Sequence, residues 1–162
     1  MLHTEQKQQA ALKKGVPVFY YYSSDPFLAR AAAEKMAAAL LQEDGESTRL
    51  DGPAPTVEEL VMAAGTISFF GTRRIVELPM LQPSAYSEKD MAEFCDVLAS
   101  TENAVFVIHS VFSEERGKLK LPKQAKKLIE TCESLGYAAE VAHPGLQELR
   151  LMLRQRAQGM DT

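Results

Sequence analysis

The feature that most constrains the fold is a regular alternation of short apolar segments with amphipathic helical patterns. Residues 104–108 (AVFVI) are apolar throughout, as expected for a central parallel strand that is covered on both faces. Residues 18–22 (VFYYY) and 73–78 (RRIVEL) have the aromatic and β-branched content of strands, and shorter strands are expected at 48–50 and 137–141. Strands that alternate with helices predict an α/β fold with a mostly parallel, five-stranded sheet flanked by helices.

Two helices are predicted in the first half of the chain. The first has Asp25 as its N-cap and Pro26 at its first position, and it runs to about Gln42. The residues expected along its apolar side are Phe27, Leu28, Ala32, Met36 and Leu40. The second helix begins with a capping box, Thr56 to Glu59, and Gly65 fits a left-handed residue at its end. Its expected apolar face consists of Val57, Leu60, Val61 and Ala64.

Two further helices are predicted in the second half. Residues 83–87 are expected as a loop, and Ser87 then caps a helix whose apolar face consists of Met91, Phe94, Cys95 and Leu98. Pro122 opens the other helix and Gly136 ends it. Its residues in apolar register are Leu121, Ala125, Leu128, Ile129 and Cys132.

The two ends of the chain differ in pattern from the rest. Residues 1–15 are polar and lack the apolar core of a secretory signal, and no apolar run approaches the ~18 residues of a membrane span. We therefore expect a cytoplasmic chain with no membrane partner. After Pro144, a last amphipathic helix has no strand to lead into. The pattern predicts one domain over residues 1–143 and the start of a truncated second domain over residues 144–162.

Composition restricts the function further. The 162 residues carry a net charge of −4 and are 46% apolar, which is enough for a core and excludes a wholly disordered chain. An acidic domain is not typical of a general nucleic-acid binder, which gathers Lys and Arg. Cys95 and Cys132 lie in apolar helical patterns, so we expect buried, reduced and inert thiols. No pair of Cys or His has zinc-ligand spacing, and no metal or cofactor is expected.

The turn after the first strand is where a nucleotide-binding sheet holds phosphate. A P-loop requires glycines, so that backbone amides can approach the phosphates, and a lysine to meet their charge. Residues 23–28 (SSDPFL) contain neither, and they place an acid and a proline at this turn. Nucleotide hydrolysis at this turn is therefore close to excluded.

His109 follows the central strand, where catalytic groups can occur. No Ser, Asp or Cys motif accompanies it, so an ordinary residue at a strand end is the favoured interpretation and catalysis the alternative. His143 precedes a proline in a connection, and His3 lies near the N-terminus.

Two segments are candidates for binding partners. Residues 66–72 (TISFFGT) place adjacent aromatics in a connection, where they either plug the edge of the sheet or anchor a partner in a pocket. Residues 116–127 contain the one basic cluster, which either contacts DNA phosphate or, as we favour here, is a solvated loop and helix face.

Four segments together resemble the N-terminal part of the delta subunit of bacterial DNA polymerase III, a clamp-loader subunit. Residues 18–28 (VFYYYSSDPFL) are similar to that family's first strand and its Asp-Pro-Phe-Leu turn, although Ser23 and Ser24 replace the usual Gly-Glu. Residues 68–76 (SFFGTRRIV) resemble its Ser-Leu-Phe-Gly-x-Arg-Arg segment. Residues 49–52 and 149–157 resemble the end of its second strand and the helix that enters its second domain.

The resemblance implies an AAA+-like domain, related to P-loop NTPases, whose nucleotide site is degenerate. It implies a non-catalytic subunit that binds the beta sliding clamp and holds its ring open for loading onto primed DNA. Carried over by residue, the clamp-binding group consists of Ile67, Ser68, Phe69 and Phe70, and Phe69 stands where the family often has Leu. Other clamp-loader subunits are implied partners, mainly through regions that follow this domain in the family. The alternative from another class is a small-molecule enzyme on a Rossmann-like or flavodoxin-like sheet, with His109 near its crevice.

Overall fold

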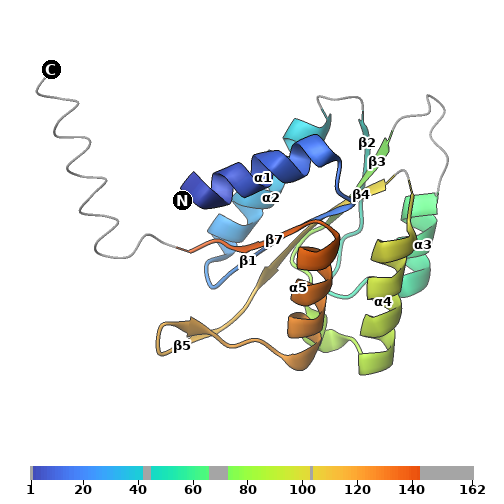
Figure 1. Cartoon of the computed structure of the whole chain (residues 1–162). Helices are drawn as coiled ribbons and strands as arrows, with labels where there is room; N and C mark the ends of the chain where they lie inside the picture. The colour runs from blue at the N-terminus through green and yellow to red at the C-terminus, as the bar shows by residue number, and fades with distance from the viewer. Residues whose placement is uncertain (1, 42–44, 66–72, 103, 143–162) are drawn as a thin grey trace, which may run out of the picture.

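A computed structural model of the chain describes residues 2–41, 45–65, 73–102 and 104–142. These residues form three layers, in which a five-stranded parallel sheet lies between two layers of helices (Figure 1). The predicted α/β class and the parallel sheet are thereby confirmed. None of the helices in the described part of the chain is long and apolar enough to cross a membrane.

The sheet has the spatial order β2-β3-β4-β1-β7. Its strands are β1 (Val18–Ser23), β2 (Gly45–Arg49), β3 (Arg73–Leu78), β4 (Ala104–Val111) and β7 (Tyr137–Glu140). β1 lies between β4 and β7, with Tyr20 in register with Ile108 on one side and Ala138 on the other. β1 and its neighbour β4 are almost completely buried, as their apolar sequences predict.

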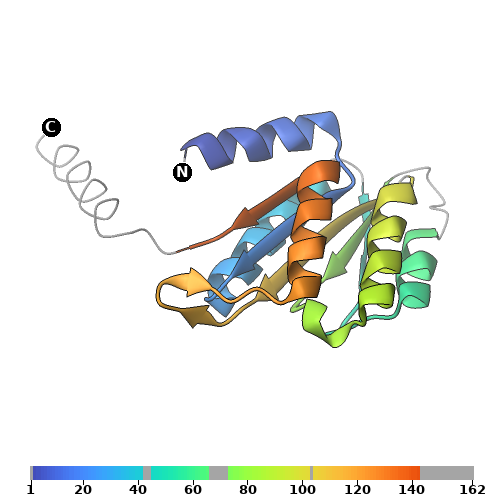
Figure 2. The same cartoon turned by 60° about the horizontal axis from the view of Figure 1, so that its bottom comes forward.

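The helices are α1 (Leu2–Lys14), α2 (Pro26–Leu41), α3 (Val57–Gly65), α4 (Glu88–Ser100) and α5 (Lys123–Leu135). α1 and α2 pack on one face of the sheet, and α3, α4 and α5 pack on the other (Figure 2). Each face has its own core, because alternate residues of every strand point to opposite sides. Tyr20 faces the layer of α4 and α5, whereas Tyr21 faces the layer of α1 and α2.

Three of the helices begin at the predicted caps. The Asp25 carboxylate accepts from the N–H of Phe27 at 2.8 Å, and the Thr56 hydroxyl accepts from the N–H of Glu59 at 3.1 Å. The Ser87 hydroxyl caps α4, and the four buried residues of α4 are those predicted from the spacing. In α5 the buried residues Ala125, Leu128, Ile129 and Cys132 were all predicted. Leu121, the fifth residue of the predicted register, lies before the helix and is partly buried.

The predicted faces of α2 and α3 were partly wrong. α2 buries Ala29, Ala33, Met36, Ala37 and Leu40, whereas Phe27 is 65% exposed. Alanines occur on every side of α2, so the spacing of its larger residues did not define the buried side. On α3, Val61 is half exposed, and Gly65 does not have the left-handed conformation predicted for it. Residues 83–85, predicted as loop, form a 3-10 helix.

Two elements were not predicted. The polar N-terminal segment forms α1, and the chain after β4 forms a hairpin of β5 (Glu114–Glu115) and β6 (Lys118–Leu119). Both residues between these strands, Arg116 and Gly117, have positive φ, of 54° and 80°. Two consecutive left-handed residues make the tight hairpin connection that suits strand twist.

Candidate functional site

In an open parallel sheet, ligands bind beyond the carboxyl ends of the strands, where neighbouring strands lead into helices on opposite faces. Here β1 leads into α2 on one face, and its neighbour β4 leads through the hairpin into α5 on the other. The crevice between the ends of β1 and β4 is therefore the position to test for a ligand site.

Hydrogen bonds of the main chain and of side chains link the groups around this crevice. The N–H of Phe112 donates to the carbonyl of Ser23 at 2.9 Å, which continues the pairing of β1 with β4 past the strand ends. The buried Ser23 hydroxyl accepts from the N–H of Asp25 at 3.0 Å. Earlier in β1, the Tyr20 hydroxyl donates to the Ser110 hydroxyl at 2.7 Å. Burial raises the pKa of the Tyr20 phenol well above its ordinary value. These polar groups thus bond to one another.

Asp25 caps the start of α2, and a helix N-terminus is a place where proteins can bind anions. The Asp25 carboxylate oxygen Oδ1 accepts from the N–H groups of Phe27 and Leu28, at 2.8 and 3.4 Å. These are amides of the first turn of α2, the group that binds phosphate in nucleotide sites. Pro26 contributes no N–H, and the carboxylate would repel an incoming phosphate. The geometry therefore fits a helix cap and does not fit a cradle for a triphosphate.

His109 lies in β4, on the face toward α2, and its side chain is almost completely buried. Its Nε2 atom accepts from the N–H of Met80 at 3.2 Å, and its carbonyl accepts from the N–H of Leu81 at 2.9 Å. Burial is the main cause that lowers the pKa of the imidazole, so the neutral form is favoured. The hollow beside it has a volume of about 10 Å³, close to that of one water molecule. His109 therefore holds the chain after β3 and has no space for a substrate.

The thiols lie where the sequence predicts them. Cys95 on α4 and Cys132 on α5 are buried and unbridged, and burial raises the pKa of both. A protonated, inaccessible thiol is a poor nucleophile, which agrees with the expectation of inert cysteines. Within the described ranges, no three His, Cys, Asp or Glu side chains gather closely enough to hold a metal ion.

The predicted clamp-binding residues Ile67, Ser68, Phe69 and Phe70 lie outside the described residues, as do His143 and the predicted last helix. The structure describes both flanks of residues 66–72. On one side, Thr56 caps α3, which buries Leu60, Ala63 and Ala64 against the sheet and α4.

On the other flank, β3 pairs with both β2 and β4. Arg74 is its second residue, and the guanidinium donates to the Thr48 hydroxyl at 2.6 Å and forms an ion pair with Glu46 at 3.3 Å. Both flanks are therefore anchored in the fold. Beside them, α3 exposes two apolar side chains, Val61 and Met62.

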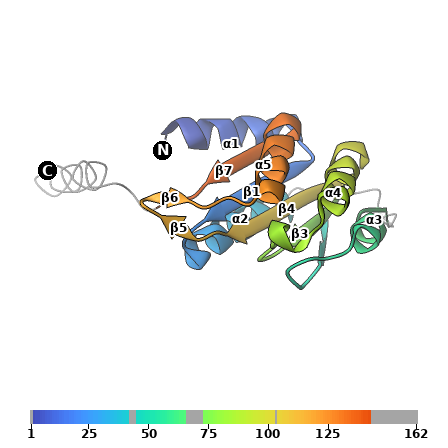
Figure 3. The ribbon, with the colours of Figure 1, turned by 90° about the horizontal axis from the view of Figure 1, so that it is seen from below.

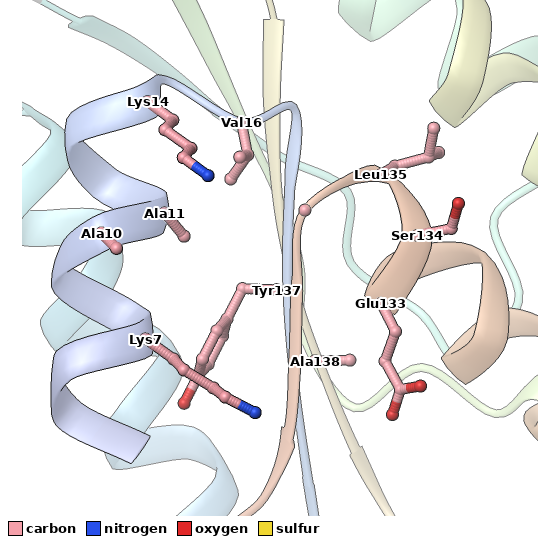
Figure 4. A pocket seen from close by; sticks show the side chains of 11 residues that line it. Lys7, Ala10, Ala11, Lys14, Val16, Glu133, Ser134, Leu135, Tyr137 and Ala138 are labelled. Carbon is pink, nitrogen blue, oxygen red and sulfur yellow. The ribbon is translucent and has the colours of Figure 1, made fainter. Parts of the chain in front are cut away.

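A groove that sequence reasoning missed follows the outer edge of β7 (Figure 4). Its volume is about 740 Å³, and it lies between α1 and the end of α5. Lys7 and Lys14 of α1 line one side and Glu133 of α5 lines the other, with Tyr137 between them. The groove needs α1 as a wall, and the sequence pattern did not predict that helix.

The basic side chains of residues 116–127 are all exposed, which fits both a solvated face and contact with DNA phosphate. Comparison with known proteins gives no further guide to this or any other site: the chain matches no family model, and no curated protein matches it.

Proposed function

We propose that this chain is a non-catalytic clamp-loader subunit of bacterial DNA polymerase III, which binds the beta sliding clamp through Phe69 and Phe70. The observation that carries the proposal is the first turn of α2. There the chain's own Asp25 carboxylate accepts from the amides of Phe27 and Leu28. A sheet arranged like that of a nucleotide-binding protein, with its phosphate position filled by its own side chain, suits a subunit that has a binding role.

The flanks of residues 66–72 also support the proposal. An aromatic pair that docks into a pocket loses less conformational entropy when both ends of its segment are already fixed. α3 is capped at Thr56, and β3 lies between two strands. We expect the exposed Val61 and Met62 of α3 to lie near the same partner surface.

In this role the subunit would hold one interface of the clamp ring open in the cytoplasm while the ring is loaded onto primed DNA during replication. Holding the ring open requires binding energy that favours the open ring over the closed ring, and it requires no reaction by the subunit itself. We expect no cofactor, and contacts with other clamp-loader subunits mainly through regions after this domain.

The alternative, a small-molecule enzyme, has less support. If the five strands of the sheet are numbered 1 to 5 along the chain, so that β7 becomes strand 5, their spatial order is 2-3-4-1-5. Flavodoxin-like sheets have the order 2-1-3-4-5, and Rossmann sheets begin 3-2-1-4-5. In addition, the hollow at His109 cannot hold a substrate. A thermal-shift panel of nucleotides and cofactors tests this alternative, and we expect no stabilisation of the clamp-binding chain.

The direct test measures binding to bacterial sliding clamps by surface plasmon resonance. Hot-spot truncations typically cost ~2 kcal/mol or more each, so Phe69→Ala with Phe70→Ala should weaken binding by at least ~100-fold if the effects roughly add. Phe27→Ala is the matched control, because Phe27 is an exposed aromatic at a different site. A large fall in melting temperature with clamp affinity retained would place the aromatic pair in the core and overturn the proposal.

A further inference from the structure

Six basic side chains gather at the carboxyl edge of the sheet. They are Arg116, Lys118, Lys120, Lys123, Lys126 and Lys127, which we call the basic strip. The strip follows the end of β4, passes through the hairpin and reaches the first turns of α5 (Figure 3). Since α5 runs back along the sheet to β7, its first residues lie at the same edge as the hairpin. The N–H of Lys120 closes the hairpin by donating to the carbonyl of Ser113 at 2.7 Å.

The charge of the basic strip is largely uncompensated. Residues 114–127 contain these six cations and two carboxylates, a net charge of +4, whereas the rest of the chain carries −8. All six cations are exposed. Lys123 forms an ion pair with Glu88 at 3.0 Å, and the other five have no ion-pair partner among the described residues. The Glu114 carboxylate accepts from the Ser24 hydroxyl at 3.1 Å.

The beginning of α5 increases the local positive potential. Acidic residues stabilise the first turn of a helix and basic residues destabilise it, because the N-terminal end of the helix dipole is positive. α4 follows this rule, with Glu88 and Asp90 after its Ser87 cap. α5 breaks it, since its first turn has no acid, Lys123 is its first residue and Pro122 provides no side-chain cap. The ion pair of Lys123 with Glu88 offsets part of this cost. Lys126 and Lys127 have no such partner among the described residues, which leaves their charge for an external anion.

The surroundings of the basic strip favour nucleic acid over a membrane or a protein groove. The large apolar side chains that the structure describes as exposed are Phe27, Leu41, Val61, Met62 and Met80, and none belongs to residues 113–127. Amphipathic helices that lie in a membrane surface and protein hot spots combine charge with apolar anchors. Binding of a phosphodiester backbone requires spaced, exposed cations and the release of counterions.

We propose that the basic strip binds the phosphodiester backbone of nucleic acid, without base specificity. The proposal does not depend on the clamp-loader function, because the isolated chain should bind DNA with no clamp present. Non-specific binding of this kind typically has a Kd of ~10⁻⁴–10⁻⁶ M at physiological salt, and its affinity falls steeply as salt is added.

The test is fluorescence anisotropy of a labelled 20-base-pair duplex and of the matching single strand, between 25 and 200 mM salt. The strip variant is Arg116→Gln, Lys120→Gln and Lys126→Gln. The control is Lys7→Gln, Lys13→Gln and Lys14→Gln, which removes the same charge from α1 on the opposite face of the sheet. We expect the strip variant to bind at least 10-fold more weakly at low salt. Its salt slope for the duplex should fall by ~2–3, since each phosphate contact contributes about 0.9.

The control variant should bind within about twofold of the parent chain, and circular dichroism should report the same fold for all three proteins. Binding of the duplex, the single strand or both at the basic strip would support the proposal. Equal weakening by both variants, equally tight binding of polyglutamate or of anionic vesicles, or no DNA binding by the parent at 25 mM salt would overturn it. The strip variant should keep its clamp affinity, and the Phe69 and Phe70 variant should keep its DNA affinity, so the two proposals fail separately.

Discussion

At Gly136, the absence of a Cβ atom allows β7 to begin directly beside β1. The Gly136 N–H donates to the carbonyl of Cys132 at 2.8 Å and ends α5. A Cβ atom at this position would collide with the carbonyl oxygen of Val18, which belongs to β1 and is fixed by the sheet. The sequence predicted that Gly136 ends the helix, but the reason is this close approach of two backbones.

We therefore expect Gly136→Ala to lower the free energy of unfolding by ~1–3 kcal/mol, the usual range for overpacking a core. Urea denaturation at pH 7 measures the change. Gly65→Ala is the control, because a Cβ at Gly65 meets nothing within 4 Å and its φ is not left-handed. The control should be as stable as the parent or more stable. Equal losses in the two variants would contradict the steric argument.

His109 makes the stability of the fold depend on pH. Burial lowers its pKa in the folded chain, although Glu34 opposes this, and the unfolded chain takes up the proton near the ordinary value of about 6.5. Below that pH the unfolded state binds more protons, so the free energy of unfolding falls as pH falls. Protonation also removes the Nε2 acceptor of Met80, whose φ of 53° is left-handed.

We expect the contribution of His109 to be complete above about pH 6.5 and to decrease toward pH 5, by at most ~1.4 kcal/mol per pH unit. His109→Gln keeps an acceptor for the Met80 amide but does not titrate. The difference in unfolding free energy between parent and variant, measured by denaturation from pH 7.5 to 5.0, should therefore narrow as pH falls. Parallel pH profiles would show that His109 does not titrate in this range.

At the scale of elements, capping and apolar spacing predicted those helices whose buried side is marked by large residues. α4 and α5 each present four buried side chains at helical spacing, and these were predicted correctly. α2 has alanines on every side, so its buried face was set by tertiary packing and its position was partly wrong. The hairpin escaped prediction because its two left-handed residues are Arg116 and Gly117, and only the glycine signals such a turn.

The Asp25 cap gives an expectation that separates its structural role from its charge. Asp25→Ala leaves the amides of Phe27 and Leu28 without this acceptor and should cost about 1 kcal/mol of unfolding free energy. Asp25→Asn keeps a side-chain oxygen and should cost less. Ser24→Ala is the control, because its hydrogen bond to Glu114 is exposed and should contribute little. An unchanged stability in Asp25→Ala would mean that water replaces the cap.

At the scale of the molecule, the layers of helices differ in how firmly they are attached. α2 to α5 carry several buried residues each, whereas Ala11 is the buried side chain described in α1. α1 is also held by a hydrogen bond from the Tyr21 hydroxyl to Gln8 Oε1 at 2.8 Å. A helix with so few apolar contacts gives a weak sequence signal, so α1 and the groove at the edge of β7 were missed.

The candidate site was predictable only in part, for a related reason. The closed turn at Asp25 follows from local sequence, because a cap and a proline dictate it. The unpaired cations of the basic strip were visible as a cluster. The sequence did not show which of these cations lack partners, because ion pairs such as that of Lys123 with Glu88 join different elements.

The weak attachment of α1 leads to an expectation for hydrogen exchange. Local opening should let the amides of α1 exchange at least ~100-fold faster than those of β1 and β4, whose residues lie in the centre of the sheet. Tyr21→Phe removes the bond to Gln8 and should speed exchange in α1 severalfold. The difference between the free energy of exchange in β4 and the free energy of global unfolding should stay the same. Tyr20→Phe is the matched control, because the neighbouring hydroxyl bonds to Ser110 on the other face and should leave the local opening of α1 unchanged. Exchange of α1 together with β4 as one cooperative unit would show that α1 belongs to the core of the fold.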